Sequence, residues 1–198
     1  MAFLMNESTF VSRAGLKLDH ALDTFDFDVT GLTCVDLGCN IGGFTDCLLQ
    51  RGASRVHAVD TGYGTLAWKL RSDPRVKTLE RTNALHLEPP VTVDLVVIDL
   101  GWTPQKLALP AGLQWLQNGH IITLVKPHYE LTEEEKAHES VGKGLSEQAA
   151  EQILGRVKEL CVSFELDIVG ETISPIKGKK SSKKGAGNRE YLLLLKQR

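Results

Sequence analysis

The sequence predicts an α/β fold built on a mostly parallel β-sheet. Two observations predict it: short apolar runs alternate with helical patterns along most of the chain, and a glycine-rich turn follows the first of these runs. A length of 198 residues suits one domain with its own core. We therefore expect residues 1–198 to form a single domain, with an N-terminal tail at 1–9 and a basic loop at 177–189.

The apolar runs predict the strands in order. Five are rich in Val, Ile or Leu, as buried parallel strands are, and they span 33–37, 55–59, 76–79, 93–100 and 120–125. Glycine or proline punctuates the helical patterns between them. These patterns predict helices at 44–51, closed by Gly52, at 64–71, stopped before Pro74, and at 104–117, closed by Gly119.

The second half of the chain adds two helices and two strands. An acidic stretch at 130–139 carries the capping-box pair Thr132 and Glu135, and Ser146 is a candidate cap for a long helix through Cys161. Strands are predicted at 162–173 and 191–196. Since no helix separates them, they are most simply antiparallel, which predicts seven strands of which one is reversed.

Composition excludes several classes. With 42% hydrophobic and 24% charged residues, the chain has the balance of a soluble globular protein rather than a disordered or membrane protein. Its four cysteines form no CxxC pair and lie in apolar runs, so we expect reduced core thiols, no metal and no disulfides. No leader or bilayer-length apolar run is visible, and we expect a cytoplasmic protein without membrane contact.

The glycine-rich turn indicates a nucleotide-like ligand. Its spacing, Gly38-x-x-x-Gly42-Gly43, differs from the dinucleotide fingerprint, and it lacks the Lys-Ser/Thr of a P-loop. Asp60 follows the second strand about 20 residues later, where a carboxylate can bind both hydroxyls of an adenosine ribose. With Asp36, this pattern resembles the cofactor site of class I S-adenosylmethionine-dependent methyltransferases. The alternative is a tight turn with Asp60 as a solvent-facing helix cap.

Longer motifs make the resemblance specific and span nearly the whole chain. They are SRAGLKL at 12–18, LGCNIGGFTDCLLQRG at 37–52, AVDTGYG at 58–64, LERTN at 79–83, VID at 97–99, LVKP at 124–127 and GNREY at 187–191. The chain thereby resembles the TlyA-type, hemolysin-named branch of the FtsJ-like RNA ribose 2′-O-methyltransferases. The resemblance implies a Rossmann-like class I fold, S-adenosylmethionine as cofactor, and RNA as partner, either ribosomal RNA or a ribosomal subunit.

The same resemblance implies a catalytic tetrad. Motif by motif it maps onto Lys17, Asp99, Lys126 and Glu190. A ribose hydroxyl is a poor nucleophile, so methyl transfer to it needs a base and alignment. Lys126 is our candidate base, because burial and a second cation such as Lys17 favour the neutral form of a lysine, while the two carboxylates orient the groups. Taken singly, Lys17 could be an exposed helix lysine and Glu190 a strand-edge charge.

Cofactor contacts are also implied by the resemblance. Residues around the methionine end would be Asp36, Gly38, Cys39, Gly42, Gly43, Phe44 and Thr45. Asp60 would hold the ribose. Asn83 would lie near the adenine, or it is simply a turn residue.

The chain departs from the family pattern in two places. Only nine residues precede Phe10, so we expect no N-terminal S4 RNA-binding domain and allow for an accessory RNA-binding partner. After Asp99, Leu100-Gly-Trp-Thr-Pro104 replaces the usual Val-Ser-Phe-Ile-Ser. Trp102 could stack an unpaired base, although burial is the commoner role for such an aromatic residue. We assign no catalytic role to His128 and Tyr129, which also depart from the pattern.

Positive charge predicts where RNA binds. The segment 177–189 holds six basic and no acidic residues, and since the whole chain carries −2, the remainder carries −8. We expect phosphate contacts from this loop and from the first motif, through Arg13, Lys177, Lys179, Lys180, Lys183, Lys184 and Arg189. The alternative is a loop that is merely solvated.

Two other functions stay open on the sequence. One is methylation of a small molecule or a base nitrogen, which the altered segment after Asp99 permits. The other is a non-catalytic RNA-binding or cytolytic protein, suggested only by the hemolysin name.

Overall fold

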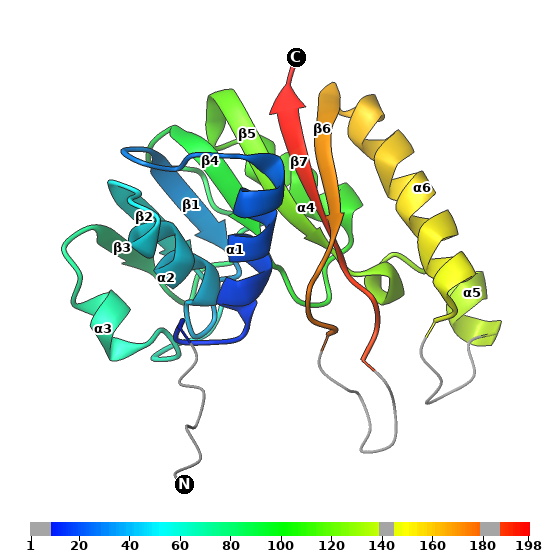
Figure 1. Cartoon of the computed structure of the whole chain (residues 1–198), viewed down its shortest axis with the longest axis horizontal. Helices are drawn as coiled ribbons and strands as arrows, with labels where there is room; N and C mark the ends of the chain where they lie inside the picture. The colour runs from blue at the N-terminus through cyan, green and yellow to red at the C-terminus, as the bar shows by residue number, and fades with distance from the viewer. Residues whose placement is uncertain (1–8, 139–144, 179–186) are drawn as a thin grey trace, which may run out of the picture.

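The computed structural model describes residues 9–138, 145–178 and 187–198. Within these ranges seven strands form one sheet in the order β3-β2-β1-β4-β5-β7-β6 (Figure 1). The strands are β1 (Thr33–Leu37), β2 (Arg55–Val59), β3 (Val76–Leu79), β4 (Val93–Ile98), β5 (Leu116–Val125), β6 (Leu166–Ile173) and β7 (Tyr191–Gln197). Only β7 is reversed: it pairs antiparallel with both β5 and β6, and the other pairs are parallel. The predicted fold class is confirmed.

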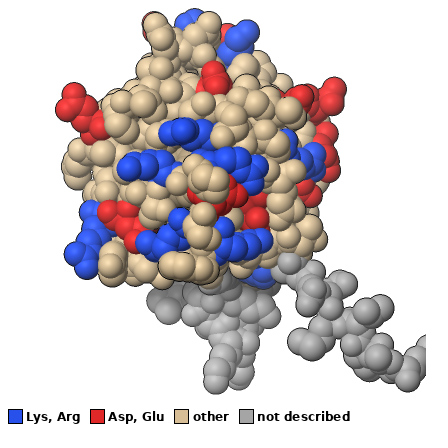
Figure 2. All heavy atoms as spheres, turned by 90° about the vertical axis from the view of Figure 1, so that its left-hand side faces the viewer, with Lys and Arg blue, Asp and Glu red and all other residues tan. Residues whose placement is uncertain are grey.

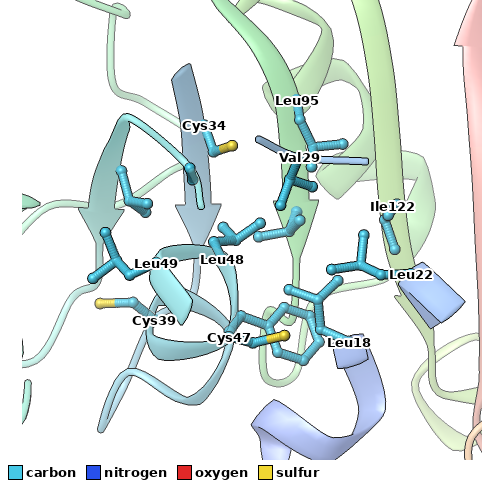
Figure 3. Packing of buried hydrophobic residues seen from close by; sticks show 14 of the residues in the cluster. Leu18, Leu22, Val29, Cys34, Cys39, Cys47, Leu48, Leu49, Leu95 and Ile122 are labelled. Atoms are coloured by element: carbon cyan, nitrogen blue, oxygen red, sulfur yellow. The ribbon is translucent and has the colours of Figure 1, made fainter. Parts of the chain in front are cut away.

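Helices cover both faces of the sheet. They are α1 (Ala14–Phe25), α2 (Gly43–Gln50), α3 (Trp68–Arg71), α4 (Gln105–Leu113), the 3-10 turn η1 (Pro127–Tyr129), α5 (Glu133–His138) and α6 (Glu147–Ser163). One core lies under α1 and α2, where Leu18, Leu48 and Ile122 meet (Figure 3). The other lies under α4 and α6, around Leu109 and Leu154. Because successive strand residues face opposite sides, a strand buried on both faces is apolar throughout.

Several predicted helix ends are confirmed. Ser146 caps α6, since its Oγ accepts the amide hydrogen of Ala149 at 3.1 Å. Thr132 and Glu135 form the capping box, each backbone N–H donating to the other's side chain. Gly52 follows α2 with a φ of +93°, a left-handed conformation that favours glycine.

Other boundaries were predicted wrongly. The helix predicted at 104–117 ends at Leu113, because the chain from Leu116 pairs with β4. Gly119 is therefore a strand residue and not a helix cap; a Cβ there would lie 2.5 Å from the carbonyl oxygen of Asp94. The predicted strand 162–173 begins only at Leu166, after α6, and the helix predicted at 64–71 shrinks to α3.

Helix α1 has no counterpart among the predicted elements. Its amino-terminal end lies directly on that of α2, and glycines make this approach close. A Cβ on Gly43 would lie 2.3 Å from Oγ of Ser12 and 2.8 Å from the backbone nitrogen of Gly15. A Cβ on Gly15 would in turn collide with the ring of Phe10, at 2.4 Å. Close contact between the two helices therefore requires glycine at position 43, and Gly15 makes room for the ring of Phe10.

Two further expectations can be compared with the structure. All four cysteines are buried and free, as predicted. Over the described ranges, no group of His, Cys, Asp and Glu has a metal-binding arrangement. Among the described residues, no helix has both the length and the apolar character needed to cross a membrane.

We predict that Gly43→Ala destabilises the fold, because the added methyl group must push α1 away from α2. The expected loss in the free energy of unfolding is roughly 1–3 kcal/mol. Gly155→Ala is the matched control: Gly155 lies within α6 and a Cβ there would meet nothing within 4 Å. It should stabilise by up to about 1 kcal/mol through helix propensity. Urea unfolding of both variants measures these changes in the free energy of unfolding. If Gly43→Ala leaves that free energy unchanged, the two helices tolerate separation and the prediction is wrong.

Candidate active site

A cavity of about 940 Å³ opens at the carboxyl ends of the parallel strands. Open α/β sheets bind ligands at this edge, because the loops leaving neighbouring strands diverge there. One part of the wall comes from the turns after β1, β2 and β3 and from the start of α2, and it includes Gly38, Cys39, Phe44, Asp60 and Asn83. Another part contains all four residues of the implied tetrad, Lys17, Asp99, Lys126 and Glu190. Residues up to 173 positions apart in sequence thus share one cavity.

Lys17 and Glu190 form a buried ion pair in this wall. Lys17 Nζ lies 2.5 Å from Glu190 Oε2, and the two residues are 8% and 3% exposed. Lys17 comes from the first half of α1, whereas Glu190 immediately precedes β7. Because β7 is reversed, its first residue Tyr191 pairs with Val125, the last residue of β5. The interpretation of Lys17 as exposed and of Glu190 as an edge charge is wrong.

Asp99 and Lys126 form the second ion pair. Asp99 directly follows β4 and Lys126 directly follows the neighbouring strand β5, which brings Lys126 Nζ into contact with Asp99 Oδ1. Lys126 Nζ also donates to the carbonyl oxygen of Leu100 at 3.1 Å. Each lysine therefore has a carboxylate partner of its own, an arrangement that fixes the position of its terminal nitrogen.

Asp36 offers the cavity a buried acceptor. Its Oδ2 accepts hydrogen bonds from the backbone N–H of Thr45 at 3.0 Å and from its hydroxyl at 2.7 Å. Its Oδ1 is buried and has no hydrogen-bond partner among the described residues. Burial raises the pKa of this carboxyl to about 7, and the nearby charge of Asp99 adds to the effect. An unpaired acceptor in the cavity wall fits a ligand that carries N–H donors or positive charge.

Asp60 and Asn83 line the cavity and also brace its loops. The carboxylate of Asp60 accepts the N–H of Asn40 at 2.9 Å and that of Gly62 at 2.7 Å. No helix begins at Asp60, so the helix-cap alternative is wrong. Asn83 Oδ1 accepts the N–H of Leu85 at 3.0 Å, which makes it a turn residue within the cavity wall. Its side-chain NH₂ group remains a donor.

Three of the implied cofactor residues lie behind the wall rather than in it. In the part of the chain that is described, Gly42, Gly43 and Thr45 do not line the cavity. Gly42 has a φ of +102° and packs on Leu70, whose Cδ1 would lie 2.3 Å from an added Cβ. Gly43 contacts the start of α1, and Thr45 holds Asp36. These residues shape the turn and its supports, and Gly38, Cys39 and Phe44 form the surface itself.

An aromatic pair stands at the mouth of the cavity. Trp102 is 87% exposed, so the expectation that it is more often buried is wrong. Its ring lies 5.2 Å from that of Tyr129, which is itself 5.5 Å from Lys126 Nζ. The sequence analysis assigned no role to Tyr129. Its position two residues beyond the LVKP motif was the one feature of the sequence that could have indicated a place beside Lys126. Burial and the charge of Lys126 lower the pKa of the adjacent His128 to about 4, so its ring is neutral near pH 7.

The residues expected to bind RNA differ in their surroundings. Arg13 is exposed and lines the cavity, and Lys177 is exposed. Arg189 is turned toward α6, where its guanidinium pairs with Glu147 and approaches Glu151 to 3.9 Å. The remaining four, Lys179, Lys180, Lys183 and Lys184, lie outside the described residues.

The structure has a second basic surface, which the sequence analysis did not predict. Figure 2 shows Lys and Arg side chains gathered on the side of the molecule that carries α3 and β3. We call this the β3-side basic surface; its residues are Arg55, Lys69, Arg71, Arg75, Lys77 and Arg81. Asp46, Glu80 and Asp73 neutralise Lys69, Arg71 and Arg75. Arg55, Lys77 and Arg81 form no ion pair with any described residue. The signal was present at 51–81, which holds seven basic and three acidic residues.

Comparison with known proteins shows which family shares this sequence and architecture. The family model for FtsJ-like methyltransferases matches residues 10–196. A Mycobacterium tuberculosis protein named 16S/23S rRNA (cytidine-2'-O)-methyltransferase TlyA is 40% identical over 96% of this chain and 70% of its own length. Hemolysin A of Brachyspira hyodysenteriae is 36% identical over 92% of this chain and 75% of its own length.

Solved structures of other proteins share this fold. A hemolysin-named protein of Lactococcus lactis superposes with a TM-score of 0.86 at 34% identity, over 96% of this chain and 89% of that one. A magnesium protoporphyrin IX methyltransferase of Synechocystis, solved with S-adenosylmethionine bound, gives a TM-score of 0.59 at 14% identity, over 93% of this chain and 80% of that one. The latter likeness shows a shared class I fold.

We predict that Asp36→Asn changes how stability depends on pH. Because burial raises the pKa of Asp36 to about 7, the folded protein retains a proton there that the unfolded chain releases near pH 4. The free energy of unfolding of the wild type therefore falls, through this group, as the pH rises from about 4 to about 7. Relative to the wild type, Asp36→Asn should gain stability over this window with a slope of up to about 1.4 kcal/mol per pH unit. Urea unfolding at pH 5, 6, 7 and 8 measures the free energy of unfolding of both proteins. If the two free energies change in parallel with pH, the prediction is wrong.

Proposed function

This chain belongs to the FtsJ-like methyltransferase family, and on that premise we propose that it methylates a ribose 2′-hydroxyl of ribosomal RNA, with S-adenosylmethionine as methyl donor. The observation that carries the proposal is the pair of lysine–carboxylate contacts in one wall of the cavity, Lys17 with Glu190 and Lys126 with Asp99. Relatives named for the same reaction on 16S or 23S rRNA support the substrate class. An enzyme acting on ribosomal RNA would work in the cytoplasm.

The glycine-turn side of the cavity suits S-adenosylmethionine. When bound, this cofactor supplies an electrophilic methyl group. Asp36 contributes a free carboxylate oxygen toward a positively charged or N–H-bearing group. Asp60 keeps lone pairs beyond those used by Asn40 and Gly62, so it can still accept the two hydroxyls of a ribose. The NH₂ group of Asn83 is available to an acceptor on an adenine ring.

The tetrad side suits proton removal from a sugar hydroxyl. The hydroxyl must lose its proton as its oxygen gains the methyl group, and a positioned base lowers the barrier to that transfer. In the proposal, Lys126 takes the proton from its neutral form, which it reaches by releasing a proton to solvent, because the ammonium that pairs with Asp99 has no lone pair to accept one. Asp99 and the carbonyl of Leu100 fix its nitrogen. Lys17, held by Glu190, is left to orient the hydroxyl.

The exterior offers two kinds of RNA contact. Trp102 and Tyr129 present aromatic rings beside the cavity, on which an unpaired base can stack. The β3-side basic surface can contact phosphates through the cations that lack a carboxylate partner in the described structure. Trp102 and Tyr129 would hold an unpaired base at the mouth of the cavity with the target ribose inside, and the β3-side basic surface would hold phosphates farther along the RNA.

We predict that Lys126→Ala lowers kcat at least about 100-fold, the scale of a lost general base, and leaves the affinity for S-adenosylmethionine within threefold. Lys158→Ala is the control, because Lys158 forms an exposed ion pair with Glu171 on α6 and β6. Labelled cofactor with separated ribosomal subunits or naked RNA gives the rate, and alkali resistance of the product identifies the methylated atom. Retained turnover would exclude Lys126 as the base, and a methylated base nitrogen would exclude the ribose.

We also predict that the triple variant Arg55→Ala, Lys77→Ala and Arg81→Ala weakens RNA binding and makes it less sensitive to salt. Losing up to three phosphate contacts should reduce the slope of log K against log salt by about two to three. The control is the triple variant Lys158→Ala, Lys196→Ala and Arg198→Ala, which removes equal charge from α6, from β7 and from the residue that follows β7. Equal slopes for the two variants would show that net charge alone matters.

A further inference from the structure

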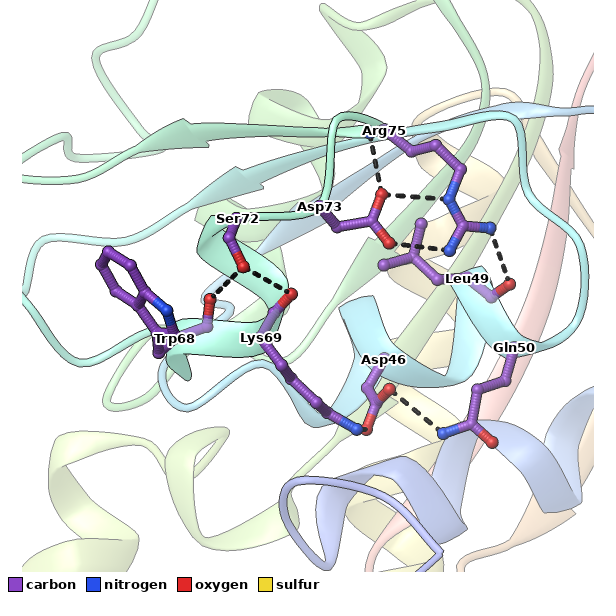
Figure 4. Close-up of polar contacts among 8 residues, drawn as sticks. All are labelled: Asp46, Leu49, Gln50, Trp68, Lys69, Ser72, Asp73 and Arg75. Atoms are coloured by element: carbon purple, nitrogen blue, oxygen red, sulfur yellow. Dashed lines mark hydrogen bonds and ion pairs between the residues drawn. The ribbon is translucent and has the colours of Figure 1, made fainter.

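Asp46 lies outside the cavity wall, yet it is one of the most connected buried carboxylates in the described structure. It sits in the first turn of α2 and is 3% exposed. Its Oδ2 accepts the backbone N–H of Val11 at 2.8 Å and contacts Nζ of Lys69 at 3.0 Å. Its Oδ1 accepts the side-chain NH₂ of Gln50 at 3.1 Å. Figure 4 shows Lys69 of α3 and Gln50 of α2 reaching Asp46 from different sides.

These contacts clamp the segment that leads into α1. Gln50 also donates to the backbone carbonyl of Thr9 at 3.0 Å, so two side chains one turn apart on α2 bind backbone groups at residues 9 and 11. Helix α1 begins three residues after Val11, and Lys17 lies in its first turn. The start of α1 has no side-chain cap of its own. Its position therefore depends on what holds the preceding residues.

We propose that Asp46 is a positioning residue for the methyl-transfer reaction: through the N–H of Val11 it sets the placement of α1 and hence of Lys17 beside Glu190. The inference rests on the proposed function for its effect on catalysis. Lys69 balances the buried charge, which would otherwise be costly. In reactions that depend on alignment, a displacement of about 1 Å can cost about 100-fold in rate. Loosening the start of α1 would thus lower kcat without removing any group that touches the substrate.

The test compares three variants of the full chain. Asp46→Asn keeps the size of the side chain but removes its charge and one acceptor oxygen. Lys69→Ala removes only the ion pair and leaves the acceptor for Val11. Asp19→Asn is the matched control, because Asp19 of α1 pairs with Arg51, directly after α2, at 2.5 Å and at a half-buried site.

For Asp46→Asn we expect kcat to fall at least tenfold, with KM for RNA and the affinity for S-adenosylmethionine within twofold of the wild type. Lys69→Ala and Asp19→Asn should keep kcat within twofold. If kcat falls as much in Lys69→Ala as in Asp46→Asn, the ion pair with α3 is responsible for the effect and the proposal fails. An unchanged kcat in Asp46→Asn overturns it as well.

A second measurement does not depend on the substrate. Acetic anhydride labels lysines according to their accessibility, and mass spectrometry reports each site. Asp46→Asn should label Lys17 severalfold faster and leave Lys126, which is held by Asp99, as slow as in the wild type. Equal acceleration at both lysines means general loosening and overturns the proposal, as does no acceleration at Lys17. If the wild type methylates no ribose, the proposed function fails, while the labelling still decides whether Asp46 positions Lys17.

Discussion

The arrangement of the candidate active site depends on the reversal of one strand. In a parallel sheet the residue before a strand lies at the edge opposite the ligand-binding edge. Glu190 precedes β7, and it reaches the cavity because β7 runs antiparallel, so that Tyr191 pairs with Val125 at the end of β5. If β7 were parallel, Lys17 would be buried without its carboxylate partner, at a cost of several kcal/mol. The topology of the last strand thus decides whether the first helix can carry a lysine into the site.

Charge balance is the second constraint. The cavity wall contains four carboxylates, Asp36, Asp60, Asp99 and Glu190. Three cations in the same wall, Arg13, Lys17 and Lys126, offset them only in part. Asp60 accepts one backbone N–H on each of its oxygens, and Asp99 and Glu190 each hold a lysine. Asp36 alone keeps a buried oxygen without a described partner. The wall is therefore complete on its tetrad side and left open to a donor on its glycine-turn side.

Support for the site comes from residues that do not line it. Gly43 lets α1 approach α2, Thr45 holds Asp36, and Asp46 holds the backbone before α1. These three residues, all in the first turn of α2, serve three different parts of the site. The motif GGFTD is accordingly a packing and positioning element as much as a ligand-binding turn, and only its Phe44 belongs to the cavity wall.

The sequence by itself determined the sheet and the reversed strand, because apolar periodicity is a local property. The candidate tetrad came from the resemblance of its motifs to those of a known family. It missed α1, which lacks a side-chain cap and has no acidic residue in its first turn, so the usual start signals are absent. It extended a helix through Leu116, since a continuous apolar run does not distinguish a helix from a strand until a partner strand is present. Only the tertiary structure decided which lysine pairs with which carboxylate, that Trp102 is exposed, and that basic residues at 55–81 form one surface. Those facts depend on distances between segments far apart in the chain, and no local pattern records them.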